Sequence, residues 1–324
     1  MIGTSSMAWV LRPVAVALLA SLLSVGNSYF VWHDGEYHND DSKSCTVVCT
    51  QHKCGTYNLL QTMDRYHQTL PSVVPDHEPL PQCSNGDLAF FLNIKTMVPA
   101  VQFDYSQARA MLMIRHPLDV VVSSHRFHLT AGEKWLHVPQ ENGLTYQEEL
   151  NTMNKTEGIM FEMTQGAAYL DTVRLLEFLE SPEAAHFRLL KLEQSKYSPH
   201  DFADELALIL GLDADKLRPI VVDELSYDKF REIKHLSPVD GELIEQIRGQ
   251  ELYGATYPYE FGLHLECEHY LAFEEIFGIK ALRILGYGDS VKMYKAAKAK
   301  QCGTPAKKRK RRKRRRKSRA ASEL

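Results

Sequence analysis

The stretch that decides the fold reads Thr50-Gln51-His52-Lys53-Cys54-Gly55-Thr56-Tyr57. It follows a short apolar run at residues 45–50 and leads into residues 55–67, which place Leu59, Leu60 and Met63 at helical spacing. The pattern predicts a buried strand, a tight turn and a helix. Exposed N–H groups at the start of such a helix, here those of Cys54 to Tyr57, favour an anion. Gly55 allows close approach to the backbone, Lys53 adds positive charge and Thr56 adds a hydroxyl, so the turn is a candidate phosphate site.

Taken alone, this first turn is a weak signal. Lys53 precedes the glycine, so the G-x-x-x-x-G-K-[ST] spacing of a Walker A loop is absent, which argues against a P-loop kinase. An ordinary strand-to-helix turn would account for the same residues equally well.

A second turn about sixty residues later favours a phosphate site over an ordinary strand-to-helix turn. It reads Arg115-His116-Pro117-Leu118-Asp119-Val120-Val121-Val122-Ser123 and follows an apolar run at residues 110–114. Pro117 suits the first turn of a helix, and Ser123 would lie two helical turns further along. Arg115 has an alternative role as the partner of Asp119 in a salt bridge. Two cationic turns at the ends of parallel strands would hold a ligand that carries two separate phosphates.

The rest of the chain alternates between strand-like and helix-like segments. Further strands are expected at residues 90–95 and 187–192. Helices are expected at residues 118–126, 146–153, 158–179 and 199–210, the last one stopped by Gly211. This alternation predicts an α/β fold with a central, mostly parallel sheet flanked by helices. We expect one large domain at residues 44–290.

The N-terminal segment, residues 1–32, contains an apolar run from Pro13 to Leu23 behind a single basic residue, Arg12. The run is too short to span a bilayer alone and suits the core of a secretory signal. Extended to Trp32 it could serve as a weak signal anchor, and a buried first strand or helix of a cytoplasmic domain is the third possibility.

The C-terminal segment, residues 291–324, carries a dense basic run. Every residue from Lys307 to Lys317 is basic, and Arg319 adds a twelfth positive charge. Subtracting these twelve from the 38 basic residues, and Glu323 from the 41 acidic ones, leaves 26 and 40, so residues 1–306 carry a net charge of −14. Such a block predicts a disordered tail that binds a polyanion, directs nuclear import or only adds solubility.

Cysteines and histidines indicate no further chemistry. The six cysteines lack paired C-x-x-C spacing, which indicates neither a zinc site nor a disulfide scaffold, and Cys45, Cys49 and Cys54 are expected to be buried thiols. The histidines fall at irregular spacings, so no metal site is expected.

Both turns resemble the sulfotransferase family that uses 3′-phosphoadenosine 5′-phosphosulfate (PAPS). Lys53-Cys54-Gly55-Thr56 is similar to the family's Lys-Ser-Gly-Thr loop for the 5′-phosphosulfate, and Arg115 through Ser123 match its 3′-phosphate segment. Tyr227 resembles the aromatic residue that stacks on the adenine, Leu285-Gly286-Tyr287 resembles a Leu-Gly-Tyr ending, and Arg248-Gly249 is a remnant of an Arg-Lys-Gly. The resemblance implies a P-loop NTPase-like sulfotransferase fold, a PAPS co-substrate and no metal. The donor-binding residues that it implies are Lys53, Cys54, Gly55, Thr56, Tyr57, Arg115, Ser123, Tyr227 and Arg248.

The chain departs from the family at the catalytic base. The family's Lys-Thr-His appears as Lys95-Thr96-Met97, and methionine cannot accept a proton. Lys53 and Lys95 remain as catalytic candidates. The Golgi-type branch uses a carboxylate after its phosphosulfate loop, and in that interval Glu78 is the first candidate for the base and His77 the second, on what could equally be an ordinary polar loop.

Two other family positions also differ. Asn58 replaces a tryptophan expected to stack on the adenine, and Leu192-Glu193-Gln194 replaces a Tyr-Glu-Asp.

The resemblance implies transfer of a sulfuryl group to a hydroxyl or amine of a glycan or small molecule. The alternative is a catalytically impaired PAPS-binding relative whose basic tail binds a polyanion. A secretory signal or signal anchor would place the chain in the secretory pathway or at the Golgi membrane, where the N-terminus could anchor it. A buried N-terminus would place it in the cytoplasm or nucleus. The sequence does not determine the oligomeric state.

Overall fold

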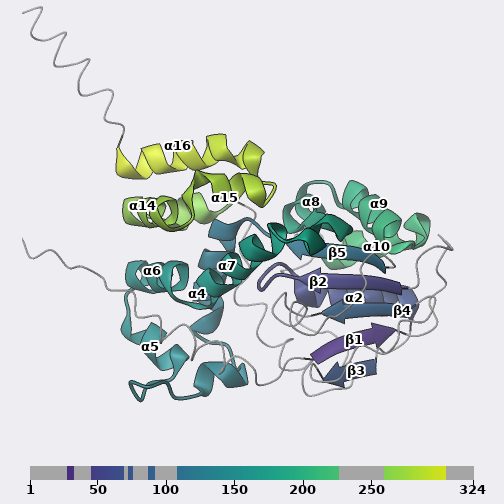
Figure 1. Ribbon diagram of the computed structural model, residues 1–324, viewed down its shortest axis with the longest axis horizontal. Helices are drawn as coiled ribbons and strands as arrows, with labels where there is room; N and C mark the ends of the chain where they lie inside the picture. Colours follow the sequence, from purple (N-terminus) through teal and green to yellow (C-terminus); the bar gives the residue numbers. More distant parts are fainter. Residues whose placement is uncertain are drawn as a thin grey trace, which may run out of the picture.

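The computed structural model describes residues 28–32, 45–68, 72–75, 87–91, 108–225 and 259–303. A six-stranded sheet runs through the centre in the order β3-β1-β4-β2-β5-β6 (Figure 1). The strands are β1 (Ser28–Trp32), β2 (Cys45–Thr50), β3 (Ser72–Pro75), β4 (Asp87–Phe91), β5 (Ala108–Ile114) and β6 (Phe187–Lys191). Neighbours from β4 to β6 pair in parallel, whereas β1 pairs antiparallel with both β4 and β3. The predicted mostly parallel sheet is therefore confirmed.

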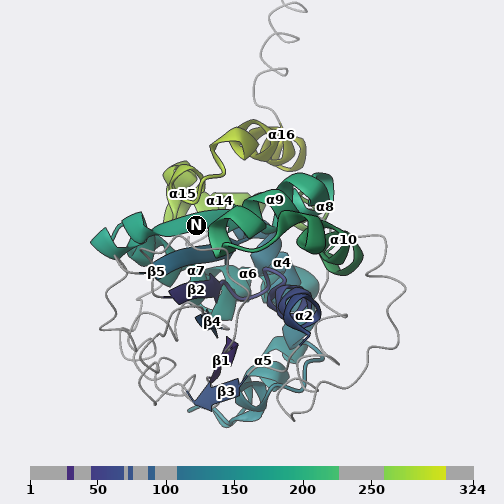
Figure 2. The ribbon, with the colours of Figure 1, turned by 90° about the vertical axis from the view of Figure 1, so that its right-hand side faces the viewer.

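Helices cover both faces of the sheet (Figures 1 and 2). One face packs against α2 (Thr56–His67), α9 (Pro199–Leu210) and α10 (Ala214–Leu225). The other packs against α4 (Pro117–His128), α6 (Lys155–Thr164) and α7 (Ala167–Leu179). Further out lie α5 (Tyr146–Thr152), α8 (Leu192–Tyr197), α13 (Phe261–His264), α14 (Cys267–Ile276), α15 (Gly278–Ile284) and α16 (Val291–Cys302). The described residues also form three short 3-10 helices, at Lys134–His137, Pro182–His186 and Gly288–Ser290, and the last of these leads directly into α16.

Alternate residues of the strands point to opposite faces, which is why each face has its own core. Val48, Met111 and Met113 pack with α2, α9 and α10, whereas Val47 and Leu112 pack with α4, α6 and α7. All five side chains are buried. A strand with two buried faces reads as a continuous apolar run, as the sequence at residues 45–50 and 110–114 does.

Several expected boundaries are wrong. The strand expected at residues 90–95 already begins at Asp87, and residues 92–95 lie outside the described residues. The helix expected at residues 158–179 is two helices that break at Gly166. A Cβ on Gly166 would lie 2.6 Å from the hydroxyl oxygen of Tyr146, so the break sits where α5 approaches closely.

The ends of the folded chain also differ from the expected domain boundaries. The last five residues of the N-terminal segment 1–32 form β1, which lies inside the sheet. Helix α16 continues the fold to Cys302, beyond the expected end at residue 290 and into the range assigned to the basic tail. None of the described helices is long and apolar enough to cross a membrane.

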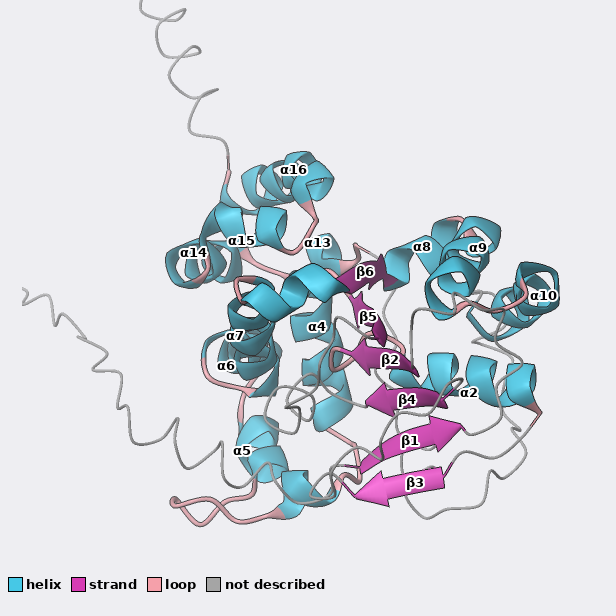
Figure 3. Cartoon of the chain, turned by 45° about the vertical axis from the view of Figure 1, so that its right-hand side comes forward, coloured by secondary structure: helices cyan, strands magenta, loops and turns pink. Residues whose placement is uncertain are grey.

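Helices α14, α15 and α16 form an outer layer over α6 and α7 (Figure 3). A disulfide between Cys267 and Cys302 joins the start of α14 to the end of α16, although the sequence spacing indicated no disulfide. Cys49 and Cys54 are free and buried, as predicted.

Removing this disulfide is expected to lower the free energy of unfolding by about 2–4 kcal/mol, because the bond closes a loop between residues 35 positions apart. The comparison is urea unfolding of the wild type and a Cys267→Ser/Cys302→Ser variant, each with and without reductant. Reductant should destabilise only the wild type. Equal free energies of unfolding for the wild type and the variant, both without reductant, would contradict the prediction.

Candidate functional site

The two cationic turns lie side by side where the parallel strands end. Strand β2 ends at Thr50 and its neighbour β5 ends at Ile114, so the turns that follow meet at one edge of the sheet. The N–H of Arg115 donates to Oε1 of Gln51 over 3.3 Å, and its Nη1 donates to the carbonyl oxygen of Lys53 over 3.1 Å. The guanidinium of the second turn thus holds the backbone of the first.

Lys53 occupies an unusual backbone conformation. Its φ is 61°, in the left-handed region that residues other than glycine rarely adopt. Its side chain is buried, and Nζ lies 3.5 Å from the centroid of the Phe127 ring on α4. A cation held over an aromatic face in this way is attracted by the ring while it keeps its charge. Backbone strain of this kind gathers at functional sites.

The residues after Lys53 present backbone amides rather than side chains. Gly55 is the N-cap of α2 and provides no side-chain cap to the first amides of the helix. The Thr56 hydroxyl is paired with that of Thr50 at 2.8 Å, and the Cys54 thiol donates to the carbonyls of Gln51 and Met113. The N–H groups of the helix start therefore supply the anion-binding capacity of this turn.

Replacing Gly55 by alanine is expected to destabilise the fold for two reasons. Its φ of +85° strains any other residue, and an added Cβ would lie 2.8 Å from Cδ1 of Leu192. Gly143 is a matched control, since it has a φ of +80° and nothing within 4 Å of the added Cβ. Urea unfolding should show a loss for Gly55→Ala that exceeds the loss for Gly143→Ala by roughly 1–3 kcal/mol. Equal losses would refute the close approach to Leu192.

The second turn is anchored by a buried carboxylate. Asp119 accepts the backbone N–H of Tyr259 at 2.5 Å and that of Phe261 at 2.9 Å. Burial raises the pKa of Asp119 to about 7, partly offset by the positive charge of Arg115. Asp119 thus ties α4 to the start of α13. Ser123 is buried on the same helix, two turns beyond Arg115.

A third turn, which follows β6, joins the same edge. Oε1 of Glu193 accepts the N–H of His116 at 2.7 Å, and Oε2 accepts the hydroxyl of Tyr287 at 2.8 Å. Burial raises the pKa of Glu193. This one side chain connects the second turn to Leu285-Gly286-Tyr287, which explains why three segments far apart in the sequence resemble parts of one site.

Helix α8 adds a cation, Lys196, that the sequence did not predict. Lys196 donates to the carbonyl oxygen of Leu225, and burial together with the nearby charge of Arg115 lowers its pKa to about 7. A lysine whose charge is disfavoured in this way gains from an anion placed beside it. No local pattern marks Lys196, because its proximity to Arg115 depends on the pairing of β5 with β6.

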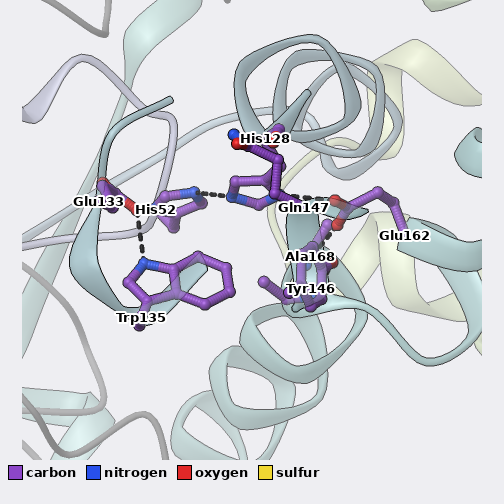
Figure 4. A network of polar contacts seen from close by, with 9 residues as sticks. His52, His128, Glu133, Trp135, Tyr146, Gln147, Glu162 and Ala168 are labelled. Carbon is purple, nitrogen blue, oxygen red and sulfur yellow. Dashed lines mark hydrogen bonds and ion pairs between the residues drawn. The ribbon is translucent and has the colours of Figure 1, made fainter. Parts of the chain in front are cut away.

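A chain of polar side chains, which the sequence did not predict either, reaches the first turn from the interior (Figure 4). Nε2 of His52 lies 3.2 Å from Nε2 of His128, and Nδ1 of His128 lies 2.6 Å from Oε1 of Glu162. His128 and Glu162 are fully buried. They come from α4 and α6, 34 residues apart, and share no sequence pattern.

Other expected site residues fall outside the described part of the chain. These are Glu78, His77, Lys95, Tyr227 and Arg248. The backbone of Tyr57 lies in the first turn of α2. Asn58, at the position of the expected tryptophan, donates to the carbonyl oxygen of Glu224 at 2.9 Å and so links α2 to α10. The described residues contain no group of three or more His, Cys, Asp or Glu side chains that could hold a metal ion.

Comparisons with known proteins agree with this architecture. No protein-family model matches the sequence, and no curated protein matches it either. Among solved structures, the chain is similar to the mouse sulfotransferase SULT7A1 complexed with PAP, with a TM-score of 0.51 and 13% identity over 91% of this chain and 99% of the other. At this identity the likeness concerns the fold alone. The chain therefore has a sulfotransferase-like α/β fold.

Proposed function

We propose that the chain is a PAPS-dependent sulfotransferase that transfers a sulfuryl group to a hydroxyl or amine. The observation that carries this proposal is the contact between the two turns, in which Arg115 donates to the carbonyl oxygen of Lys53 over 3.1 Å. It places two cationic groups, each at the end of a parallel strand, within one connected site. PAPS has its anionic groups at two separate positions of one nucleoside, which suits such a pair.

The donor set fits the phosphosulfate end of PAPS at the first turn. The amides at the start of α2, from Gly55 to Asn58, and the Lys53 ammonium would bind the 5′-phosphosulfate. Arg115 and Ser123 would bind the 3′-phosphate, with Lys196 as a further cation near Arg115. Because their motifs resemble those of the family, we propose that Tyr227 stacks on the adenine and that Arg248 binds a phosphate.

The reaction is an in-line displacement at sulfur. A new S–O or S–N bond forms to the acceptor as the S–O bond to the 5′-phosphate breaks, and the acceptor proton passes to a base. Negative charge grows on the bridging oxygen that leaves with PAP. Lys53 and the amides of the first turn would stabilise that charge in a site that needs little reorganisation.

The proposed function is tested by transfer from ³⁵S-labelled PAPS. The acceptors are water, a simple phenol, a primary alcohol, an amine and a desulfated acidic glycan, since small molecules and glycans are both proposed acceptors. Labelled product from at least one acceptor is expected. Binding of PAP with no transfer to any of them would favour the alternative, a catalytically impaired relative that holds a polyanion through its basic tail.

We also propose a cellular compartment and a partner for the chain. The disulfide Cys267–Cys302 supports an oxidising compartment, which agrees with a secretory or Golgi location and with a signal or anchor ahead of β1. In the lumen, the basic run at residues 307–317 would attract an acidic glycan. Fractionation of cells tests the location, and recovery in the cytosol or nucleus would contradict it.

A further inference from the structure

The proposed reaction needs a base, and the position that carries the family's histidine is Met97. The buried chain of polar side chains beside Lys53 offers one. His52 directly precedes Lys53 in the first turn, and both side chains adjoin the ring of Phe127. The imidazole of His52 thus lies beside Lys53, which is proposed to stabilise the bridging oxygen that leaves with PAP.

Glu162, at the far end of this chain, is surrounded by donors. Its Oε2 accepts the N–H of Ala168 in the first turn of α7 at 3.3 Å, and the hydroxyl of Tyr146 also bonds to the carboxylate. The Tyr146 oxygen in turn accepts the N–H of Ala167 at 3.0 Å, so its own proton is directed to Glu162. The N–H of Ala168, the hydroxyl of Tyr146 and the positive end of the α7 dipole therefore all face the Glu162 carboxylate.

A carboxylate can only accept hydrogen bonds, so the contact with Glu162 determines the tautomers of both histidines. Nδ1 of His128 donates to Oε1 of Glu162, so Nε2 of a neutral His128 is left as an acceptor. Nε2 of His52 must then donate to Nε2 of His128. The remaining nitrogen of His52, Nδ1, carries a lone pair and can accept a proton.

His128 is held in place on several sides. Its ring packs edge-on against Trp135 and Tyr146, with centroid distances of 5.1 and 5.5 Å. Gln147 donates to its backbone carbonyl oxygen at 3.0 Å. A rotation of this ring would break the contacts with Glu162 and His52 together, so the ring orientation is fixed by packing.

We propose that His52 is the general base of the sulfuryl transfer, with His128 and Glu162 as positioning residues that hold it in the accepting tautomer. This inference rests on the proposed function. The acceptor proton moves to Nδ1 of His52 as the acceptor oxygen or nitrogen bonds to sulfur, and PAP leaves with the bridging oxygen. The imidazolium that forms is stabilised through His128 by the charge of Glu162.

The protonation state of free His52 suits a base at neutral pH. Burial, followed by the nearby His128 and Lys53, lowers the pKa of His52 well below its usual value of 6.5. The charged or titratable groups that face it from the packed elements are Lys53 on its own turn, His128 on α4, and Glu162 and Tyr146 behind His128. The wild type should therefore keep its kcat/KM as the pH falls through 6.5 and lose it only at lower pH.

The first test is kinetic and uses the full chain. Hydrolysis of PAPS to PAP and sulfate is measured together with transfer to the best acceptor of the panel, because water requires no knowledge of the acceptor. His52→Gln should lower turnover about a hundredfold or more while the Kd for PAP stays unchanged. Glu162→Gln should lower it by about tenfold or more. His67→Gln, at the far end of α2, is the control that should leave turnover unchanged.

The second test needs no acceptor and no variant. Long-range ¹⁵N NMR of histidine-labelled wild type at neutral pH should show His52 protonated at Nε2 and His128 protonated at Nδ1. A proton on Nδ1 of His52 would overturn the proposal, as would full turnover by His52→Gln. Wild type that binds PAP but transfers sulfate to neither water nor any acceptor would overturn the proposed sulfuryl transfer together with its base, whereas the two results just named would overturn the base alone. Failure of the wild type to bind PAP would remove both the proposed function and the alternative of an impaired PAPS-binding relative.

Discussion

Replacing Lys53 by methionine is expected to lower sulfuryl transfer by about a hundredfold or more. Methionine keeps a long apolar stem against Phe127 and removes only the ammonium, which lies 3.5 Å from the centre of that ring. The missing charge is the one proposed to stabilise the bridging oxygen as it leaves. Since that charge is largest in the transition state, kcat should fall far more than the affinity for PAP.

The control for this variant is Lys216→Met. Nζ of Lys216 also lies over an aromatic ring, that of Tyr66 at 4.4 Å, but it belongs to α10 rather than to the first turn. The two variants remove the same group from the same kind of contact, so any shared loss reflects packing. Full turnover by Lys53→Met would show that Lys53 does not stabilise the leaving oxygen.

Replacing Arg115 by lysine is expected to weaken PAP binding by about tenfold to a hundredfold. Lysine keeps the positive charge near Asp119 and Glu193, but it loses the planar fork that reaches both the Lys53 carbonyl and a phosphate. The effect should be specific for the 3′-phosphate, so AMP, which lacks that group, should bind almost as well as before. Isothermal titration with PAP and AMP measures both.

Arg218→Lys is the matched control for Arg115→Lys. Arg218 pairs with Asp204 and Asp215 on the surface of α9 and α10, and it contacts neither turn. It should leave both titrations unchanged. Equal weakening of PAP and AMP by Arg115→Lys would mean that Arg115 supports the first turn only and does not bind the 3′-phosphate.

Much of the fold could be predicted because its central strands are buried on both faces. The apolar runs at residues 45–50 and 110–114 leave few alternatives to parallel strands, and each strand ends directly before a helix start. The turns at Gly55 and Pro117 are marked by residues with strong local preferences. Each of these signals lies within about ten residues, so it can be recognised from the sequence without knowledge of the fold.

What the sequence did not reveal depends on contacts between distant elements. Cys267 and Cys302 lie on separate helices, and His128 meets Glu162 only because α4 packs on α6. The break at Gly166 likewise follows from the approach of Tyr146 on α5. None of these pairs has a characteristic spacing, and each becomes visible only once the helices are placed on the sheet.

The measurement that tests the central claim most directly is the binding of PAP and AMP to the wild-type chain by isothermal titration. The claim is that the turns at Lys53 and Arg115 form one site for a nucleotide with phosphates at both ends. It predicts saturable binding of PAP at one site, at least about tenfold tighter than AMP, because the 3′-phosphate gains charge-assisted hydrogen bonds. Absence of PAP binding, or equal affinity for PAP and AMP, would contradict it.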